Sequence, residues 1–321
     1  AEPSKLKIYI GPTSVPADNS IYNCVFVQLQ DASGKPARAR QDTTISLSSS
    51  ATNVGTVDSL MTIQSGNTYG SANFYSTFTP GSTSIAAAAS GYATVQASVT
   101  TIGPKASAVA VYGFPALLPA DGGAYEAVMV QLQDSTGSPA KAPKGGVQIA
   151  LSCSNIQVGD VTPSVSIAEG QTYSKATFTT TTTAGQAVIT PVTSDYTAKT
   201  GTITTKTCSL TPAQLKIYTG PTKVIADSSA YKQIAIELQD TAGNPAIAAS
   251  DITVTLASSD QIIGTLETQL IIPQSKTYAL ATLTSTYKPG TTTITAAATD
   301  LTAASQTIST TGFIPSKLAV Y

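Results

Sequence analysis

Histidine and tryptophan are both absent from this chain of 321 residues. Histidine is the commonest general base and the commonest metal ligand in proteins. Its absence therefore excludes a serine–histidine triad, a histidine-based zinc site and a two-histidine iron site. No constellation of carboxylates takes its place. We predict a protein that is not an enzyme, with no catalytic residue, no cofactor and no metal site.

Charged residues are also scarce. They make up 11% of the chain, against roughly a quarter in an average globular protein. The formal net charge is −1, and lysine and arginine do not cluster. Binding to nucleic acid depends on such clusters, so nucleic acid is excluded as a partner. The predicted surface is neutral and rich in hydroxyl groups.

The sequence has no apolar run of about 18 residues, the length that spans a bilayer, so we predict no direct membrane span. The chain opens at Ala1-Glu2-Pro3, without a charged and apolar leader. Such an opening fits a mature secreted protein. The expected location is extracellular, at the cell surface.

What the sequence does contain is a long repeat. Four tyrosines that end similar tripeptides are spaced by 103, 106 and 103 residues: Tyr9, Tyr112, Tyr218 and Tyr321. Solenoid units of about 20–50 residues cannot bury a core alone, so units of this greater length are domains. We predict immunoglobulin-sized domains at residues 1–104, 105–210 and 211–312, then the first strand of a fourth repeat at residues 313–321. Short connections between them predict an elongated rod.

Apolar and polar residues alternate at the same place in every unit. In the segment 22–31, Val25, Val27 and Leu29 share one face, and segments 125–134 and 231–240 repeat the pattern. Seven or so short segments of this kind per unit, with turn signals between them and no helical period, predict an antiparallel β-sandwich. The predicted fold class is therefore all-β, with three tandem sandwiches.

Two turns carry the same residues in every unit. One has an aspartate shortly before the long alternating strand, and the other follows that strand as Asp-x-x-Gly-x-Pro. Aspartate accepts hydrogen bonds from its own backbone, and glycine supplies a positive φ angle. We predict structural turns at Asp18, Asp31, Gly34, Pro36, Asp121, Asp134, Gly137, Pro139, Asp227, Asp240, Gly243 and Pro245.

Calcium binding is an alternative role for these aspartates, because calcium prefers carboxylate oxygens. Each neighbourhood offers one carboxylate at a time, and no Asp-x-Asp-x-Asp-Gly loop is present. Turn capping is the interpretation that we favour.

These turns, together with Ser76-Thr77, Ser285-Thr286 and the later Gly-x-x-x-Ile-x-Ala segments, resemble the bacterial immunoglobulin-like domain of the invasin and intimin type. The resemblance covers all three units, and the second departs from it in having Thr180-Thr181. It implies immunoglobulin-like sandwiches of the kind found in stalks and adhesive arms of cell-surface proteins. The shared motifs are turns and core positions, which are specific for fold and weak for function.

The three cysteines are candidates for cross-links. A Cys153–Cys208 disulfide would tie the end of one strand to the junction of the second and third units, and two unpaired thiols are the alternative. Cys24 is predicted on the solvent side of its strand, as a partly covered thiol or an intermolecular cross-link. On that same side lie Cys24 and Phe26 in the first unit, Ala127 and Met129 in the second, and Gln233 and Ala235 in the third. The apolar patch on the first unit indicates lateral packing between subunits.

The last residues repeat the first ones and predict an assembly strand, comprising Pro315, Lys317, Leu318, Val320 and Tyr321. Two interpretations remain open: a further repeat follows in a longer protein, or the strand inserts into a neighbouring subunit. We expect a structural surface protein, acting as a stalk, surface-layer component or filament subunit, whose partners are copies of itself or further repeats. The alternative is an adhesin that binds a receptor or glycan through its loops.

Overall fold

The computed structural model describes residues 2–312, 314 and 318. Every regular element in this part of the chain is a β-strand. The all-β prediction is confirmed. Across the described residues no helix is long and apolar enough to cross a membrane. The assembly-strand residues Pro315, Lys317, Val320 and Tyr321 lie outside the described residues, so that hypothesis stays a prediction.

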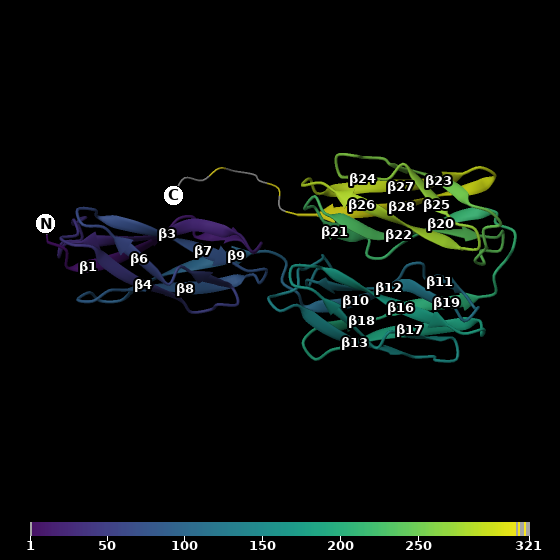
Figure 1. Ribbon diagram of the computed structural model, residues 1–321, viewed down its shortest axis with the longest axis horizontal. Coiled ribbons are helices and arrows are strands. Elements are labelled where there is room, and N and C mark those ends of the chain that lie inside the picture. The colour runs from purple at the N-terminus through teal and green to yellow at the C-terminus, as the bar shows by residue number, and fades with distance from the viewer. Residues whose placement is uncertain (1, 313, 315–317, 319–321) are drawn as a thin grey trace. The chain divides into compact units, whose positions relative to one another are not determined.

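Figure 1 shows the strands in chain order. Residues 1–104, the first repeat, contain β1 (Lys5–Ile10), β2 (Ser14–Pro16), β3 (Ile21–Gln30), β4 (Thr43–Ser49), β5 (Gly55–Val57), β6 (Leu60–Ile63), β7 (Tyr69–Ser76), β8 (Gly81–Ala88) and β9 (Val95–Ile102). Residues 105–210, the second repeat, contain β10 (Ala108–Gly113), β11 (Leu117–Pro119), β12 (Ala124–Gln133), β13 (Val147–Cys153), β14 (Gly159–Val161), β15 (Ser164–Ile167), β16 (Tyr173–Thr180), β17 (Gly185–Val192), β18 (Thr197–Lys199) and β19 (Gly201–Lys206). Residues 211–312, the third repeat, contain β20 (Gln214–Thr219), β21 (Lys223–Ile225), β22 (Ala230–Gln239), β23 (Ile252–Ser258), β24 (Gly264–Leu266), β25 (Gln269–Ile272), β26 (Tyr278–Ser285), β27 (Gly290–Ala298) and β28 (Leu301–Thr311).

Similar strand pairings recur in all three repeats. In the first, sheet β1-β3-β7-β5 packs on sheet β2-β9-β8-β4-β6 around one apolar core. The alternation in β3 explains this packing, because Val25, Val27 and Leu29 are fully buried between the sheets. In the third repeat the long strand β28 pairs with both β20 and β27 and so joins the two sheets at one edge.

The sheets differ from the antiparallel prediction by several parallel pairings, two of which join β10 to β18 and β20 to β28. The first strand of each repeat breaks at a proline-containing turn, and its second half crosses to the other sheet. There it pairs in parallel with a late strand, as β2 does with β9, β11 with β19 and β21 with β28. The short strands that result lack the length over which alternation can be read, which is why the sequence indicated fewer strands.

A β-bulge at the start of the long strand overturns the solvent-side placement of Cys24. The pairing of β3 with β7 shifts between Tyr22 and Val25, and the extra residue leaves Cys24 and Val25 both buried. The same shift occurs in β12 and β22. Cys24 is 0% exposed and belongs to the core of the first repeat, so it cannot form an intermolecular cross-link in the folded chain.

A glycine in each repeat marks a close approach within the core. A Cβ atom on Gly55 would lie 2.2 Å from the ring of Phe74, and one on Gly159 would lie 2.5 Å from the ring of Phe178. In these two repeats the short strand that follows the loop therefore rests directly on an aromatic core residue, which no larger side chain permits. In the third repeat the matching Gly264 lies against Leu283, whose side chain would be 2.9 Å from an added Cβ atom.

The chain divides into two compact units: one holds the first repeat, and the other holds the second and third repeats apart from residues 141–146. The later repeats fall together because their sheets pack face to face, through Phe114, Met129 and Ala235. The elongated rod stays a prediction. The boundaries at residues 104, 210 and 312 stay a prediction.

Candidate functional site

The aspartate before each long strand accepts a set of hydrogen bonds that close the turn. Asp18 accepts from the backbone N–H of Ser20 at 3.1 Å, from the Tyr22 hydroxyl at 2.9 Å and from the Ser76 hydroxyl at 3.1 Å. Burial, followed by the hydrogen bond to Asp18, raises the pKa of Tyr22. Asp121 and Asp227 bind Tyr125 and Tyr231 in the same way, at 2.7 and 2.9 Å.

The second aspartate closes the turn after the long strand. Asp31 accepts from the backbone N–H groups of Ser33 and Lys35 at 2.9 and 3.0 Å, and Gly34 has a φ angle of 85°. The hydrogen bond from the Ser33 hydroxyl, followed by that from the Lys35 backbone, lowers the pKa of Asp31. Equivalent bonds are made by Asp134 beside Gly137 and by Asp240 beside Gly243. The prolines of these turns form isolated bridges to the strand before them: Pro36, Pro139 and Pro245.

Carboxylates and thiols do not gather into a metal site in the described part of the chain. No group of three or more of them lies close enough together to hold a metal ion. The repeated aspartates sit at separate turns, and each is engaged by neighbouring backbone and hydroxyl groups. Calcium ligation therefore has no observation in its favour.

The predicted Cys153–Cys208 disulfide is wrong, because all three cysteines are free thiols. Sheet register explains why. Cys153 lies opposite Ile189, which lies opposite Gly201 at the start of β19, whereas Cys208 follows the far end of that strand. The length of β19 separates the two cysteines by roughly 17 Å, far beyond the reach of a disulfide. Instead, the Cys153 thiol donates to the carbonyl oxygen of Gly159 at 3.2 Å.

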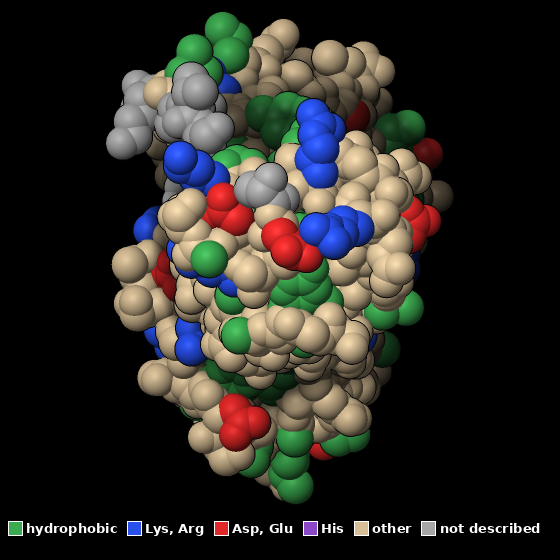
Figure 2. Space-filling view, turned by 90° about the vertical axis from the view of Figure 1, so that its left-hand side faces the viewer, with side chains coloured by type: hydrophobic (Ala, Val, Ile, Leu, Met, Phe, Trp, Pro, Cys, Tyr) green, Lys and Arg blue, Asp and Glu red, His purple; other side chains and the backbone are tan. Residues whose placement is uncertain are grey.

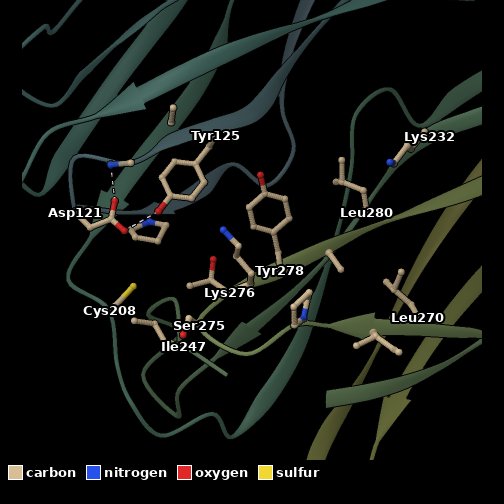
Figure 3. A pocket seen from close by; sticks show the side chains of 17 residues that line it. Asp121, Tyr125, Cys208, Lys232, Ile247, Leu270, Ser275, Lys276, Tyr278 and Leu280 are labelled. Carbon is tan, nitrogen blue, oxygen red and sulfur yellow. Dashed lines mark hydrogen bonds between the residues drawn. The ribbon is translucent and has the colours of Figure 1, made fainter. Parts of the chain in front are cut away.

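An open hollow lies between the second and third repeats. Figure 3 shows Asp121, Tyr125 and Cys208 on one side of it and Ser275, Lys276 and Tyr278 on the other. Burial raises the pKa of the Cys208 thiol to about 11 and that of Tyr278 to about 12. Both groups therefore stay protonated at neutral pH, and neither is an activated nucleophile.

A second shared feature covers the outer side of the sheet that contains each long strand. We call it the tyrosine face, and it consists of Tyr9, Phe26, Gln28, Gln30 and Tyr69 in the first repeat, Tyr112, Met129, Gln131, Gln133 and Tyr173 in the second, and Tyr218, Ala235, Glu237, Gln239 and Tyr278 in the third. Strand register defines these equivalences, since Tyr9 lies opposite Phe26 as Tyr112 lies opposite Met129.

One hydrogen-bond network recurs on all three tyrosine faces. Gln133 donates from Nε2 to the Tyr112 hydroxyl at 2.7 Å and to Gln131 Oε1 at 2.9 Å. Gln30 makes the same two bonds in the first repeat, at 3.1 and 2.9 Å. Gln239 makes them in the third, at 3.0 and 2.8 Å. The face is thus preserved as a unit.

The tyrosine faces of the second and third repeats pack on each other. The ring centroids of Tyr125 and Tyr278 are 6.3 Å apart, and those of Tyr173 and Tyr231 are 6.2 Å apart. Gln131 also donates to the carbonyl oxygen of Lys223 across the interface, at 3.3 Å. As a result Met129, Gln131 and Ala235 are almost completely buried.

Glu237 is a carboxyl group buried on this interface. It is 0% exposed and accepts from Gln239 through Oε2, while its Oε1 has no hydrogen-bond partner in the part of the chain that the structure describes. Burial raises the pKa of Glu237 to about 8. Glutamine occupies the matching positions 28 and 131 in the other repeats.

The lateral packing between subunits that the sequence indicated for the first repeat stays a prediction. In the second and third repeats the same side of the strand is covered within the chain. Met129 and Ala235 meet residues of the neighbouring repeat rather than water. Sequence reasoning used Tyr112 only to mark the repeat and assigned no interface role to Tyr112, Gln133 or Tyr173. Their recurrence at equal spacing in all three repeats was the available signal.

The surface in Figure 2 consists mostly of uncharged polar side chains and backbone, with a few charged side chains of both signs scattered over it. This view agrees with the predicted scarcity of charged side chains.

No protein-family model matches the chain, and no curated protein is significantly similar to it in sequence. Solved structures do match. Invasin, a bacterial integrin-binding protein, is 18% identical over 96% of this chain and 60% of its own, with a TM-score of 0.40. The Escherichia coli adhesin FdeC is 15% identical over 97% of this chain and 98% of its own, with a TM-score of 0.29.

Domains 4–9 of the surface layer protein SbsC are 14% identical over 97% of this chain and 48% of their own length, with a TM-score of 0.38. The chain thus spans 60% of the invasin structure and about half of the SbsC structure. Intimin and Yersinia pseudotuberculosis InvD are also among the matched structures.

Proposed function

We propose that this chain is a non-enzymatic structural component of a cell surface, built from tandem immunoglobulin-like sandwiches at residues 1–104, 105–210 and 211–312. Its role would be that of a stalk, a surface-layer component or a filament subunit. The observation that carries this proposal is the repetition of one complete set of structural devices. The capped turns, the bulge and the tyrosine face recur in every repeat, and none is modified into a reactive site.

The polar groups of the described residues support a structural role. The aspartates close turns, the buried glutamines bind tyrosines, and the buried threonines bind backbone, as Thr101 does with the carbonyl oxygen of Thr79 at 3.0 Å. In the hollow of Figure 3 Asp121 is already bound to Tyr125, so it is not poised as a general base toward Cys208 or Ser275. A chain whose polar side chains are used in this way offers repeated surface and mechanical continuity rather than chemistry.

Electron microscopy of the native material, with gold-labelled antibody against this chain, tests the proposal. The expected result is label on the outside of cells, on a lattice, a filament or a projecting stalk. Label confined to the cell interior would contradict it. The form of the labelled structure would also distinguish the three roles.

An adhesin is the second candidate, and the hollow of Figure 3 is the observation that favours it. Sugars bind to protein surfaces that combine aromatic rings with hydroxyl and charged groups, and Tyr125, Tyr278, Ser275 and Lys276 offer this combination. Binding of the chain to a glycan array, weakened at least tenfold by Lys276→Ala and unchanged by Lys288→Ala, would support this role. An array without signal would count against it.

A further inference from the structure

The tyrosine face of the first repeat lacks the cover that its counterparts have. Tyr9 is 45% exposed and Tyr69 is 57% exposed, whereas Tyr173 and Tyr278 at the position of Tyr69 are half-buried. Phe26 and Gln28 are likewise partly exposed, although Met129, Gln131, Ala235 and Glu237 at the same positions are buried. The tyrosine face is therefore covered in the second and third repeats and open to solvent in the first.

The closed interface is symmetric. Tyr125 corresponds to Tyr231, and Tyr278 corresponds to Tyr173, so the two aromatic pairs exchange equivalent residues between the repeats. An interface in which residue i meets residue j and residue j meets residue i is isologous, with an approximate twofold axis through its centre. A surface that packs in this way is complementary to a copy of itself.

The centre of the closed interface pairs a large side chain with a glycine. Met129 of the second repeat lies over Gly220 of the third, where a Cβ atom would come within 2.7 Å of the Met129 sulfur. The first repeat holds both halves of this pair, because Phe26 corresponds to Met129 and Gly11 corresponds to Gly220. Around Gly11 the surface is hollowed, and Tyr9, Ile10, Phe26, Gln28 and Tyr69 line the hollow. The ring of Phe26 from a second copy has the size and apolar character to fill it.

Charge does not oppose such pairing. The position of the buried Glu237 is occupied in the first repeat by the neutral Gln28, whose Oε1 already accepts from Gln30. Lys5 and Lys7 are cations on this face, opposite Gln30 and Gln28. The counterpart of Lys7, Lys216, stays exposed in the packed third repeat. A lysine at this position therefore remains at the solvent-exposed rim.

We propose that the tyrosine face of the first repeat is a docking surface for the same face of a second copy of this chain. The two copies are related by a twofold axis, with Tyr22 of each against Tyr69 of the other and Phe26 of each in the hollow at Gly11 of the other. The first repeat has the neutral Gln28 where the closed interface buries Glu237, and it has the aromatic Phe26 where the closed interface has Met129 and Ala235. Association is therefore driven by burial of apolar surface. The inference does not depend on the proposed surface role.

Sedimentation equilibrium of the full chain tests it. The expected result is a concentration-dependent rise in mass toward twice the 32.6 kDa of one chain. Phe26→Asp and Tyr69→Lys should each weaken the association at least tenfold. Both side chains lie outside the apolar core of their repeat, so the variants keep their thermal unfolding temperature. The control is Leu60→Asp, at an exposed apolar residue on the opposite sheet, which should dimerise like the wild type.

Fluorescence supplies a second readout, because the chain has no native tryptophan. The emission of Phe26→Trp should shift to shorter wavelength as the protein concentration rises, while that of Leu60→Trp should not. A chain that stays monomeric at all concentrations would overturn the proposal. So would a dimer that persists in Phe26→Asp and Tyr69→Lys, since another surface would then be responsible.

Discussion

The ring of Tyr125 lies 6.3 Å from the ring of Tyr278, although the two residues belong to different repeats. Their counterparts in exchanged order, Tyr231 and Tyr173, lie at nearly the same distance, 6.2 Å. The second and third repeats are thus joined as an internal pseudo-dimer. The following predictions test this interface and the turns, strands and thiols around it.

Breaking the internal pseudo-dimer should separate two repeats without unfolding either. Met129→Lys places a charge at a fully buried position that packs on the neighbouring repeat. We expect a loss of about 2–4 kcal/mol in the free energy of unfolding and a larger radius of gyration in small-angle scattering. Phe26→Lys, at the matching position of the first repeat, is the control and should change neither quantity at low protein concentration. An unchanged radius for Met129→Lys would show that the faces do not hold the pair together.

Glu237 should make stability depend on pH. Its pKa is 4.5 as an isolated side chain and about 8 in the folded chain, so the folded state retains the proton more tightly. The stability that protonated Glu237 contributes is therefore fully present below pH 4.5, and this contribution is lost as the pH rises to about 8. Glu237→Gln introduces the residue found at positions 28 and 131 and should remove this loss.

Urea denaturation at several pH values measures the effect of Glu237→Gln. The variant and the wild type should be similar in stability near pH 4.5, and the variant should be more stable by roughly 3–5 kcal/mol at pH 9. Parallel pH profiles for the two proteins would contradict the buried carboxyl as the cause.

Removing a turn aspartate should cost stability through the donors it leaves unpaired. Asp18→Ala deprives the Ser20 backbone, the Tyr22 hydroxyl and the Ser76 hydroxyl of one acceptor. The expected loss is about 1–3 kcal/mol in the free energy of unfolding, measured in urea. Asp195→Ala is the control, because Asp195 is exposed and its side chain binds only the adjacent Ser194 hydroxyl. Equal effects of the two substitutions would argue against the capping role.

Adding a methyl group to Gly55 should strain the core of the first repeat. The new Cβ would lie 2.2 Å from the Phe74 ring and 2.8 Å from the carbonyl oxygen of Tyr75. Because the backbone oxygen cannot easily move, Gly55→Ala should destabilise the chain by about 1–3 kcal/mol. In Gly103→Ala the nearest atom to the new Cβ lies at 3.4 Å, so this control should lower the melting temperature much less.

The free thiols can be counted directly. Unfolding the chain without a reductant and alkylating it should add three labels by mass spectrometry, since Cys24, Cys153 and Cys208 are all free. In the folded chain Cys24 should be the slowest to react, because it is 0% exposed and burial raises its pKa to about 11. Only one label in the unfolded, unreduced chain would restore the Cys153–Cys208 disulfide.

Much of the fold was predictable because its signals are local. Alternation placed Val25, Val27 and Leu29 in the core. The turn from Asp31 to Pro36 was predictable because the residues that form its hydrogen bonds are neighbours in the sequence. The bulge was not predictable in this way. A bulge has no distinctive residue type in this sequence, yet its extra residue moves the Cys24 side chain from the solvent side of the strand to the core side.

The partners of surface residues were harder to predict for a physical reason. Met129 and Gln131 alternate with core residues, and alternation says which side of a sheet a residue occupies but not what covers that side. The disulfide failed on similar grounds, because the separation of Cys153 from Cys208 follows from strand order and register. The resemblance to invasin-type domains identified the fold, whereas its turn motifs carry no information about the tyrosine face.

The parallel pairing of β2 with β9 has a mechanical consequence. In the first repeat β2 follows β1 near the start, and β9 is the last strand, with residues 100–102 beside Ser14, Val15 and Pro16. Tension between the two ends of the repeat therefore pulls these strands in opposite directions along their length. Their hydrogen bonds are loaded together in shear and must rupture together, whereas an antiparallel hairpin would open one bond at a time. Resistance to pulling is thereby concentrated in a patch of a few residues.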